Sequence, residues 1–187
     1  MCVPTRALMD ELAHKVPGEQ FEEAMERGGV HGALEFLNAR SPYRYTAIYR
    51  FEGEMVRNLY FFDRLGTASS DPSPVPMGDT FCQFVGAPGT FSTGNSLEDS
   101  RLDEHPKREE LKSYFGLPLS RNPGTLFGSL CHFDVLPQSI ADDEIPFLES
   151  IAPELMKHLK SSDARLNAIK VIAACAGIYW ARGLFHP

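Results

Sequence analysis

The sequence predicts an α+β fold in which helices at both ends of the chain flank an antiparallel sheet. Two observations support this fold class. Paired apolar and aromatic runs separated by turn signals occur at residues 44–62 and 113–134, as is typical of β-hairpins. Apolar residues recur at helical spacing before the first hairpin and after the second.

The second hairpin, Ser113 to Asp134, is predicted to be covered on both faces. Asn122, Pro123 and Gly124 form its turn, because proline fixes φ and glycine supplies the positive φ of a type II turn. Both alternating sets of its second strand are largely apolar: Leu126, Gly128 and Leu130, and then Phe127, Ser129, Cys131 and Phe133. A half-solvated strand would alternate between apolar and polar residues.

The segment before the first hairpin contains two predicted helices. Residues Arg6 to Lys15 form a short helix, and residues Gln20 to Arg40 carry apolar side chains at helical spacing. Gly28 and Gly29 interrupt the second helix. Each glycine costs about 1 kcal/mol relative to alanine in a helix interior, so we expect a break at this pair.

The first hairpin joins strands at Arg44 to Phe51 and Met55 to Phe62 through a Glu-Gly turn, and one alternating set of its first strand is aromatic. A loop rich in Gly, Ser, Asp and Pro follows. After it we expect a short helical turn from Asp79 to Phe84 and a weak strand at Thr90 to Ser92. Pro106 to Tyr114 has helical character, because oppositely charged residues recur at i and i+3.

The C-terminal part of the chain is predicted to be helical. Asp142, Asp143 and Glu144 are typical of a helix start, because acidic side chains are favoured at the positive end of the helix dipole. The stretch Ser162 to Ala181 is also predicted to be a helix, but its apolar residues surround it on every side. A helix that buries one face does not need this pattern, so we expect it to pack on a second surface such as a partner subunit.

Length and charge limit the function. A chain of 187 residues suits one domain, which we place at residues 1–160, followed by a helical extension at 161–187. The net charge of −7 argues against nucleic-acid binding, which relies on clustered Lys and Arg. No secretory signal is evident, and the longest apolar run is about half of the ~20 residues of a membrane span. The sequence therefore predicts a cytoplasmic protein with no membrane and no nucleic-acid partner.

The reactive residue types match no standard catalytic or metal motif. Four cysteines are widely spaced without a C-x-x-C pair: Cys2, Cys82, Cys131 and Cys175. This spacing indicates reduced thiols, and neither a zinc site nor a disulfide framework. Motifs of serine hydrolases, zinc hydrolases, phosphate loops and dinucleotide sites are absent. His105, His132 and His158 have no metal-ligand spacing, so the sequence identifies no cofactor and predicts a protein that is not an enzyme.

Four segments, in this order, resemble the GAF domain family of small-molecule sensor modules: Asn95 to Arg101, Tyr114 to Leu119, Gly128 to Asp134 and Ala141 to Ala152. The resemblance covers about residues 20–160, which form the expected core of the domain. It implies a central antiparallel sheet with a layer of N-terminal and C-terminal helices on one face. A ligand pocket would lie under loops and short helices on the other face.

The resemblance also implies which side chains line that pocket. Small-molecule sites are mostly apolar with a few polar groups. Asp99 and Arg101 lie in the loop that would roof the pocket, where a solvated local ion pair is the alternative interpretation. The candidate ligand-binding residues are Tyr45, Tyr49, Phe81, Cys82, Asp99, Arg101, Phe127, Cys131 and Phe133.

Three branches of the family match only in part. Cyclic-nucleotide binders carry Asn-Lys where this chain has Asn-Pro, although its later Asp-Glu pair fits. Bilin-binding members attach the chromophore through a cysteine near the pocket helix, whereas Cys131 lies in a predicted strand. Free methionine sulfoxide reductases use a helical cysteine, which Cys82 resembles, and a later loop cysteine that is absent between residues 95 and 113.

We therefore expect a stand-alone sensor that binds an unidentified small molecule and signals through a homodimer of terminal helices or through a protein partner. One alternative is a small thiol-dependent enzyme, similar to free methionine sulfoxide reductase, that uses Cys82. Another is a degenerate interaction module whose pocket is filled by side chains. Cys82 and Cys131 could face one pocket as a redox pair, although two small buried hydrophobic residues are the favoured interpretation.

Overall fold

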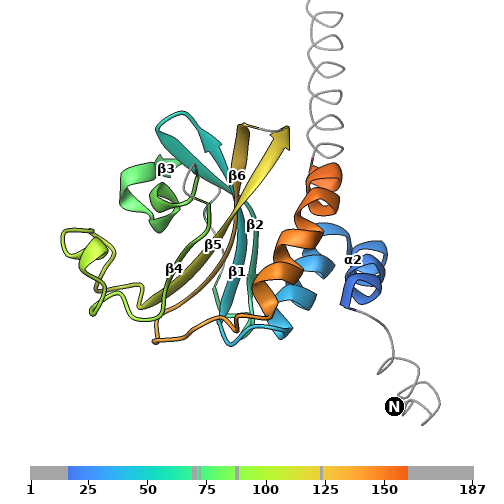
Figure 1. Ribbon diagram of the computed structural model, residues 1–187, viewed down its shortest axis with the longest axis horizontal. Coiled ribbons are helices and arrows are strands. Elements are labelled where there is room, and N and C mark those ends of the chain that lie inside the picture. The colour runs from blue at the N-terminus through green and yellow to red at the C-terminus, as the bar shows by residue number, and fades with distance from the viewer. Residues whose placement is uncertain (1–16, 69–70, 72, 87–88, 123, 160–187) are drawn as a thin grey trace, which may run out of the picture.

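The structure of the chain is a computed structural model that describes residues 17–68, 71, 73–86, 89–122 and 124–159. These residues form a curled six-stranded antiparallel sheet in the order β3-β2-β1-β6-β5-β4 (Figure 1). The elements are α2 (Pro17–Ala39), β1 (Tyr45–Glu52), β2 (Met55–Asp63), β3 (Val75–Pro76), η1 (Met77–Asp79), η2 (Phe81–Phe84), β4 (Phe91–Thr93), η3 (Ser100–Leu102), β5 (Ser113–Asn122) and β6 (Thr125–Asp134). Residues 144–159 are also helical. The helices expected at residues 6–15 and 162–181, and with them the 161–187 extension, lie outside the described residues.

The predicted α+β fold and both predicted hairpins are confirmed. The hairpins are β1–β2 and β5–β6, and their inner strands β1 and β6 pair with each other at the centre of the sheet. The predicted interruption of α2 is present as well. Gly29 has φ 59° and ψ −149°, a backbone conformation that residues with a side chain rarely adopt.

The prediction of a helix at residues 106–114 is wrong. Residues 106–110 form turns, and β5 begins at Ser113. The two i,i+3 ion pairs that suggested a helix do form, but such exposed pairs contribute only a few tenths of a kcal/mol. The pairing of Ser113 with Asp134 and of Tyr114 with Phe133 in β6 fixes an extended backbone here instead.

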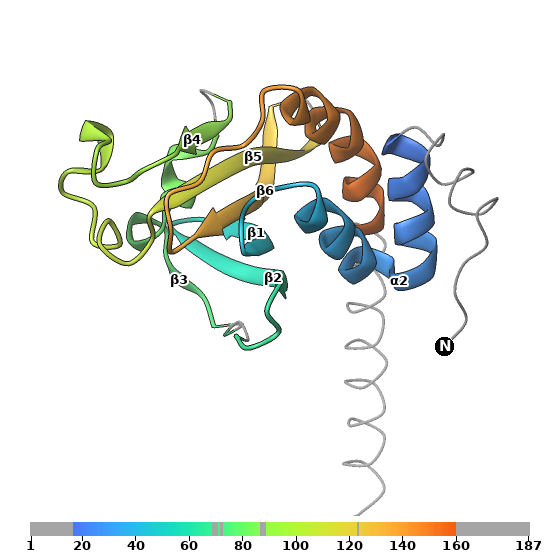
Figure 2. The same cartoon turned by 90° about the horizontal axis from the view of Figure 1, so that it is seen from below.

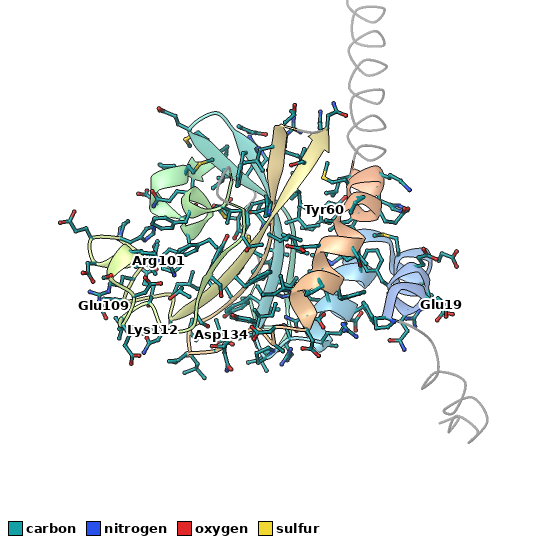
Figure 3. All side chains as sticks on the ribbon, in the orientation of Figure 1. Glu19, Tyr60, Arg101, Glu109, Lys112 and Asp134 are labelled. Atoms are coloured by element: carbon teal, nitrogen blue, oxygen red, sulfur yellow. The ribbon has the colours of Figure 1, made fainter. Side chains whose placement is uncertain are left out.

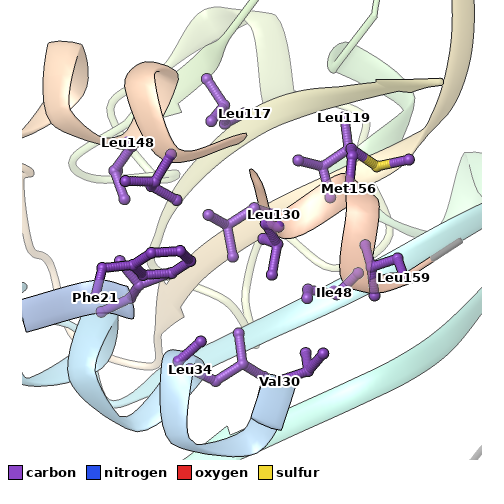
Figure 4. Packing of buried hydrophobic residues seen from close by; sticks show 14 of the residues in the cluster. Phe21, Val30, Leu34, Ile48, Leu117, Leu119, Leu130, Leu148, Met156 and Leu159 are labelled. Carbon is purple, nitrogen blue, oxygen red and sulfur yellow. The ribbon is translucent and has the colours of Figure 1, made fainter. Parts of the chain in front are cut away.

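One face of the sheet is covered by α2 and by the helix at residues 144–159 (Figures 1 and 2). Side chains from both helices interlock with side chains from the sheet in the larger core (Figure 4). Members of that core include Phe21, Leu34, Ile48, Leu117, Leu130, Leu148 and Met156. Arg40, just after α2, donates hydrogen bonds of 2.7 and 2.6 Å to the carboxylate of Glu144, so the end of one helix is joined to the start of the other.

The opposite face is covered by η1, η2 and the loops that carry β4 and η3, drawn in green in Figure 1. A second cluster of buried side chains lies between these segments and the sheet: Val56, Phe81, Cys82, Val85, Phe91, Leu102, Tyr114 and Cys131. The prediction that both faces of the second hairpin are covered is therefore confirmed. The sheet separates a helical layer from a layer of loops and short helices.

His132 in β6 is a fully buried imidazole on the helical side of the sheet. Its ring stacks against Tyr43 and Phe115, and its Nδ1 lies 2.8 Å from the hydroxyl oxygen of Thr46. Burial, with the positive charge of Arg64 as a smaller cause, lowers the pKa of His132 to about 3. The imidazole is therefore neutral in the folded protein near neutral pH.

We expect the free energy of unfolding to fall by about 1 kcal/mol between pH 7 and pH 5.5 because of His132 alone. The folded pKa lies below the unfolded value near 6.5, so below that pH the unfolded chain binds a proton that the folded chain excludes. Urea denaturation at both pH values measures this loss, and His132→Asn should reduce it. His31→Asn, the same change at an exposed site of α2, should leave it intact. An unchanged pH dependence in His132→Asn would contradict the assignment.

Candidate functional site

A cavity of about 330 Å³ lies on the face of the sheet away from the helices. Its walls come from β1, β5 and β6 on the sheet side and from η1, η2 and the turns at residues 106–110 on the loop side. The lining residues are Tyr45, Tyr49, Asp79, Thr80, Phe81, Cys82, Lys107, Glu110, Leu111, Tyr114, Phe133 and Val135. Aromatic rings make up much of the wall, while the charged side chains come from η1 and from the turns.

Five of the nine predicted ligand-binding residues line this cavity: Tyr45, Tyr49, Phe81, Cys82 and Phe133. They come together because β1 and β6 are neighbours and η2 packs across them. Tyr45 stacks on Phe133 with ring centroids 5.2 Å apart, and Tyr45 also stacks on Phe61 of β2 at 5.6 Å. Cys131 is fully buried behind the cavity wall, next to Cys82.

Phe127 lies elsewhere, which corrects its placement among the pocket residues. It belongs to the core on the helical side of the sheet. The pairing of β5 and β6 shifts register here: Leu119 faces Gly128, whereas the next residue, Ser120, faces Leu126. Phe127 is therefore the extra residue of a β-bulge, and a bulge breaks the strict alternation on which the prediction relied.

Asp99 and Arg101 also lie outside the cavity. They form a partly exposed ion pair at 2.6 Å at the start of η3, and Arg101 appears on the loop side of the sheet in Figure 3. The guanidinium packs over the ring of Phe91 at 4.5 Å and donates a hydrogen bond to the carbonyl of Ser92. The pair closes its own loop and borders a separate polar depression at residues 92–101.

Sequence reasoning missed several residues of the site. Tyr114 could have been found, because it lies near the start of the second hairpin, opposite the predicted pocket residue Phe133 near its end. Lys107, Glu110 and Leu111 had no such signal, since their segment was expected to be helical. Their place in the cavity wall follows from turns that only the tertiary structure reveals.

The two thiols of the site are neighbours. The sulfur atoms of Cys82 and Cys131 are 4.0 Å apart. The hydroxyl of Tyr114 lies 2.9 Å from the Cys131 sulfur and donates to the Cys82 sulfur at 3.4 Å. The hydroxyl of Ser129 lies 3.1 Å from Cys131 and donates to Cys82 at 3.6 Å. Two hydroxyl groups and two thiols thus form one buried polar cluster behind the cavity.

Within this cluster the pKa values of the two thiols shift in opposite directions. The hydrogen bond from Cys131, with smaller contributions from Tyr114 and Ser129, lowers the pKa of Cys82 to about 7 against the opposing effect of burial. Burial raises the pKa of Cys131 well above its usual value, and burial also raises that of Tyr114. These directions favour Cys82 over Cys131 as the thiol that ionises, with the Tyr114 hydroxyl as a hydrogen-bond donor to it.

Within the described ranges, no group of three or more His, Cys, Asp and Glu side chains is placed to hold a metal ion. The three histidines considered above are dispersed: His105 packs edge-on against Phe81, His132 lies in the helical-side core, and His158 pairs with Glu154. No helix within the part of the chain that the structure describes has the length and apolarity needed to cross a membrane.

Neither a family model nor a curated protein matches the sequence. Solved structures match it at low identity. The type II free methionine-R-sulfoxide reductase from Thermoplasma acidophilum has a TM-score of 0.56 and 17% identity, over 75% of this chain and 95% of that one. The GAF domain of an Acinetobacter phosphoenolpyruvate-protein phosphotransferase has a TM-score of 0.60 and 14% identity, over 86% and 97%.

A third solved structure is the free methionine-R-sulfoxide reductase from Neisseria meningitidis in complex with its substrate. Its TM-score is 0.60 at 14% identity, over 88% of this chain and 96% of that one. The chain therefore has a GAF-like fold. At this level of identity the likeness concerns the fold alone, and the structures that share it include both a phosphotransferase GAF domain and reductases.

Proposed function

We propose that this protein is a sensor module that binds a small molecule in the 330 Å³ cavity. The observation that carries the proposal is the composition of the cavity wall. Rings from β1, β5 and β6 provide an apolar surface, and Asp79, Lys107 and Glu110 bring charge to the same site. Ligand sites typically combine apolar walls with a few polar groups that fix orientation. The expected ligand is a small, flat, mainly apolar molecule with a polar end.

The unfilled volume also weighs against the filled-pocket alternative. A degenerate module would bury side chains where this structure has a cavity of about 330 Å³, which lies at the lower end of the range for small-molecule sites. Binding of a cyclic nucleotide gains no support, because Glu144 lies in the helix that packs on the other face and Asp143 lies next to it. Covalent attachment of a bilin gains no support either, because Cys131 is enclosed behind the cavity wall.

The central strands β1 and β6 contact both the cavity and the helices, so they could couple ligand binding to helix packing. On β1, Tyr45 and Tyr49 face the cavity while Ile48 packs in the helical-side core. On β6, Phe133 faces the cavity and Leu130 packs against the helices. A ligand that favours one cavity geometry would thereby favour one packing of α2 and residues 144–159. Signalling through a homodimer or a protein partner, and a cytoplasmic location, are part of this proposal.

Replacing Leu111 by tryptophan should weaken ligand binding by at least about tenfold, because the larger ring occupies the cavity that the ligand needs. Ligand-observed NMR with indole as an aromatic probe measures the affinity, and native mass spectrometry reports any molecule retained during purification and the number of subunits. Leu97→Trp, the same change at an exposed loop position, is the matched control and should bind like the unmodified chain.

Two results would contradict the cavity proposal. One is equal binding of indole by Leu111→Trp and by the unmodified chain. The other is the absence both of a retained molecule and of binding by any member of a panel of small aromatic acids and amines.

The second candidate function is thiol-dependent reduction of a small sulfoxide. It is favoured by the placement of Cys82 in the cavity wall, 4.0 Å from a second thiol, and by the two reductases among the similar structures. Dithiol-dependent turnover of free methionine-R-sulfoxide, lost in Cys82→Ser, would establish it. No turnover with a dithiol in excess would end this candidate and leave the sensor proposal standing.

A further inference from the structure

Cys82 and Cys131 come from segments 49 positions apart, yet their sulfur atoms are 4.0 Å apart. A disulfide bond has a length of about 2.05 Å, so the two sulfurs must approach by about 2 Å to form one. Cys131 is fixed in β6, which is paired on both sides. Cys82 lies in η2, a 3-10 helix of four residues with extended backbone at both caps. Closing this gap therefore requires movement on the η2 side, by side-chain rotation and a shift of that short helix.

The two thiols differ in access and acidity. Cys82 borders the cavity, with 2% of its surface exposed, whereas Cys131 does not line it and is fully buried. The hydroxyl groups of Tyr114 and Ser129 donate to the Cys82 sulfur. These bonds stabilise a thiolate at Cys82, and a thiolate is the form of cysteine that reacts as a nucleophile. The thiol of Cys131 lies directly behind Cys82, where it can react with an oxidised Cys82 sulfur.

We propose that Cys82 and Cys131 are a peroxide-reactive pair that closes to a reversible disulfide behind the cavity wall. The Cys82 thiolate attacks one oxygen of a hydroperoxide, the O–O bond breaks, and Cys82 becomes a sulfenic acid while the other oxygen leaves as hydroxide or alkoxide and takes up a proton. The Cys131 thiol then attacks the Cys82 sulfur, the S–O bond breaks and water leaves. The two thiols lose two electrons, which reduce the peroxide, and a dithiol reductant restores both thiols.

The disulfide has a consequence for the cavity. It would draw η2 toward β6, and Thr80, Phe81 and Cys82 all border the cavity from that segment. Oxidation is therefore expected to reduce the affinity for an aromatic probe. This coupling rests on the proposed ligand-binding function, whereas the formation of the disulfide does not.

The test uses the full-length chain with Cys2→Ser and Cys175→Ser, so that only the pair can react. After hydrogen peroxide, alkylation under denaturing conditions and mass spectrometry should show both thiols lost, a cross-linked peptide joining the two positions, and full recovery with dithiothreitol. In the same background, Cys131→Ser should stop at a Cys82 sulfenic acid that dimedone traps. Cys82→Ser should react at least about tenfold more slowly, because Cys131 is protonated and enclosed.

Tyr114→Phe tests the hydroxyl cluster, and it should slow disulfide formation because a donor to the thiolate is lost. Tyr43→Phe removes a buried hydroxyl from the helical-side core that bonds to neither Cys82 nor Cys131, and it should leave the rate unchanged. Failure of the pair to cross-link in the folded protein, or equal peroxide rates for the two single-cysteine variants, would overturn the proposal. Indole binding that is equal before and after oxidation would overturn the coupling alone, while indole binding by neither form would point to failure of the ligand-binding function.

Discussion

Replacing Gly128 by alanine is expected to lower the free energy of unfolding by about 3 kcal/mol. Gly128 lies in β6 opposite Arg50 of β1, at the centre of the sheet. A Cβ at this position would overlap the carbonyl oxygen of Tyr49 and lie 2.9 Å from its carbonyl carbon and 3.0 Å from Cα of Arg50. These are backbone atoms of a paired strand, so they cannot move aside as a flexible side chain would. Equilibrium urea denaturation measures the loss.

The matched control is Gly18→Ala in α2. An alanine Cβ at Gly18 meets no atom within 4 Å, and this glycine does not have a positive φ. Its stability should stay within about 0.5 kcal/mol of the unmodified chain. If Gly128→Ala were as stable as Gly18→Ala, the close approach of β1 and β6 described here would be wrong. The same close approach places Tyr49 of the cavity wall directly beside β6, so Gly128→Ala should also weaken binding of the indole probe.

Patterns that are local in the sequence predicted local structure well. Alternation and turn residues located the hairpin at Ser113 to Asp134, and the pair Gly28-Gly29 located the break in α2. These features depend on residues next to one another, whose conformational preferences act within a few positions. The same patterns predicted the two-sided burial that places a loop layer over the sheet.

The site was only partly predictable because it depends on how distant segments meet. Phe127 was assigned to the wrong face because a single bulge reverses the alternation, and the one sequence signal for that bulge is the adjacent Gly128 inside the strand. The proximity of Cys82 and Cys131 has no signature in their spacing, since it arises when η2 crosses β6. Two thiols that looked like ordinary buried residues therefore form a reactive pair, with Cys82 in the cavity wall and Cys131 behind it.

Asp63, at the end of β2, organises the loop that follows the first hairpin. Its carboxylate accepts hydrogen bonds from Arg44 at 2.8 and 3.0 Å and from the backbone N–H groups of Leu65, Thr67 and Ala68. The bond from Arg44 and then these backbone donors hold the pKa of Asp63 far below its usual range. The side chain is almost fully enclosed, with 1% of its surface exposed.

Replacing Asp63 by asparagine is expected to lower the free energy of unfolding by about 2 kcal/mol at pH 7. The amide nitrogen of asparagine cannot accept hydrogen bonds from the N–H groups that the carboxylate oxygen accepted, so these buried donors lose their partner. Asp71→Asn changes an exposed aspartate in the same connection and should cost far less, because water can replace its hydrogen bonds. Equal losses in the two variants, measured by urea denaturation, would show that the Asp63 network does not stabilise the loop.

The same variant tests the charge of Asp63 through pH. Because the folded pKa is depressed, the carboxylate stabilises the folded state above the unfolded value near 3.9, and this contribution is lost as the pH falls below that value. The difference in stability between the unmodified chain and Asp63→Asn should therefore be constant from pH 7 to pH 5 and shrink between pH 4 and pH 2. A difference that does not shrink between pH 4 and pH 2 would mean that the substitution acts through packing, and that the carboxylate charge does not hold the loop against β1 and β2.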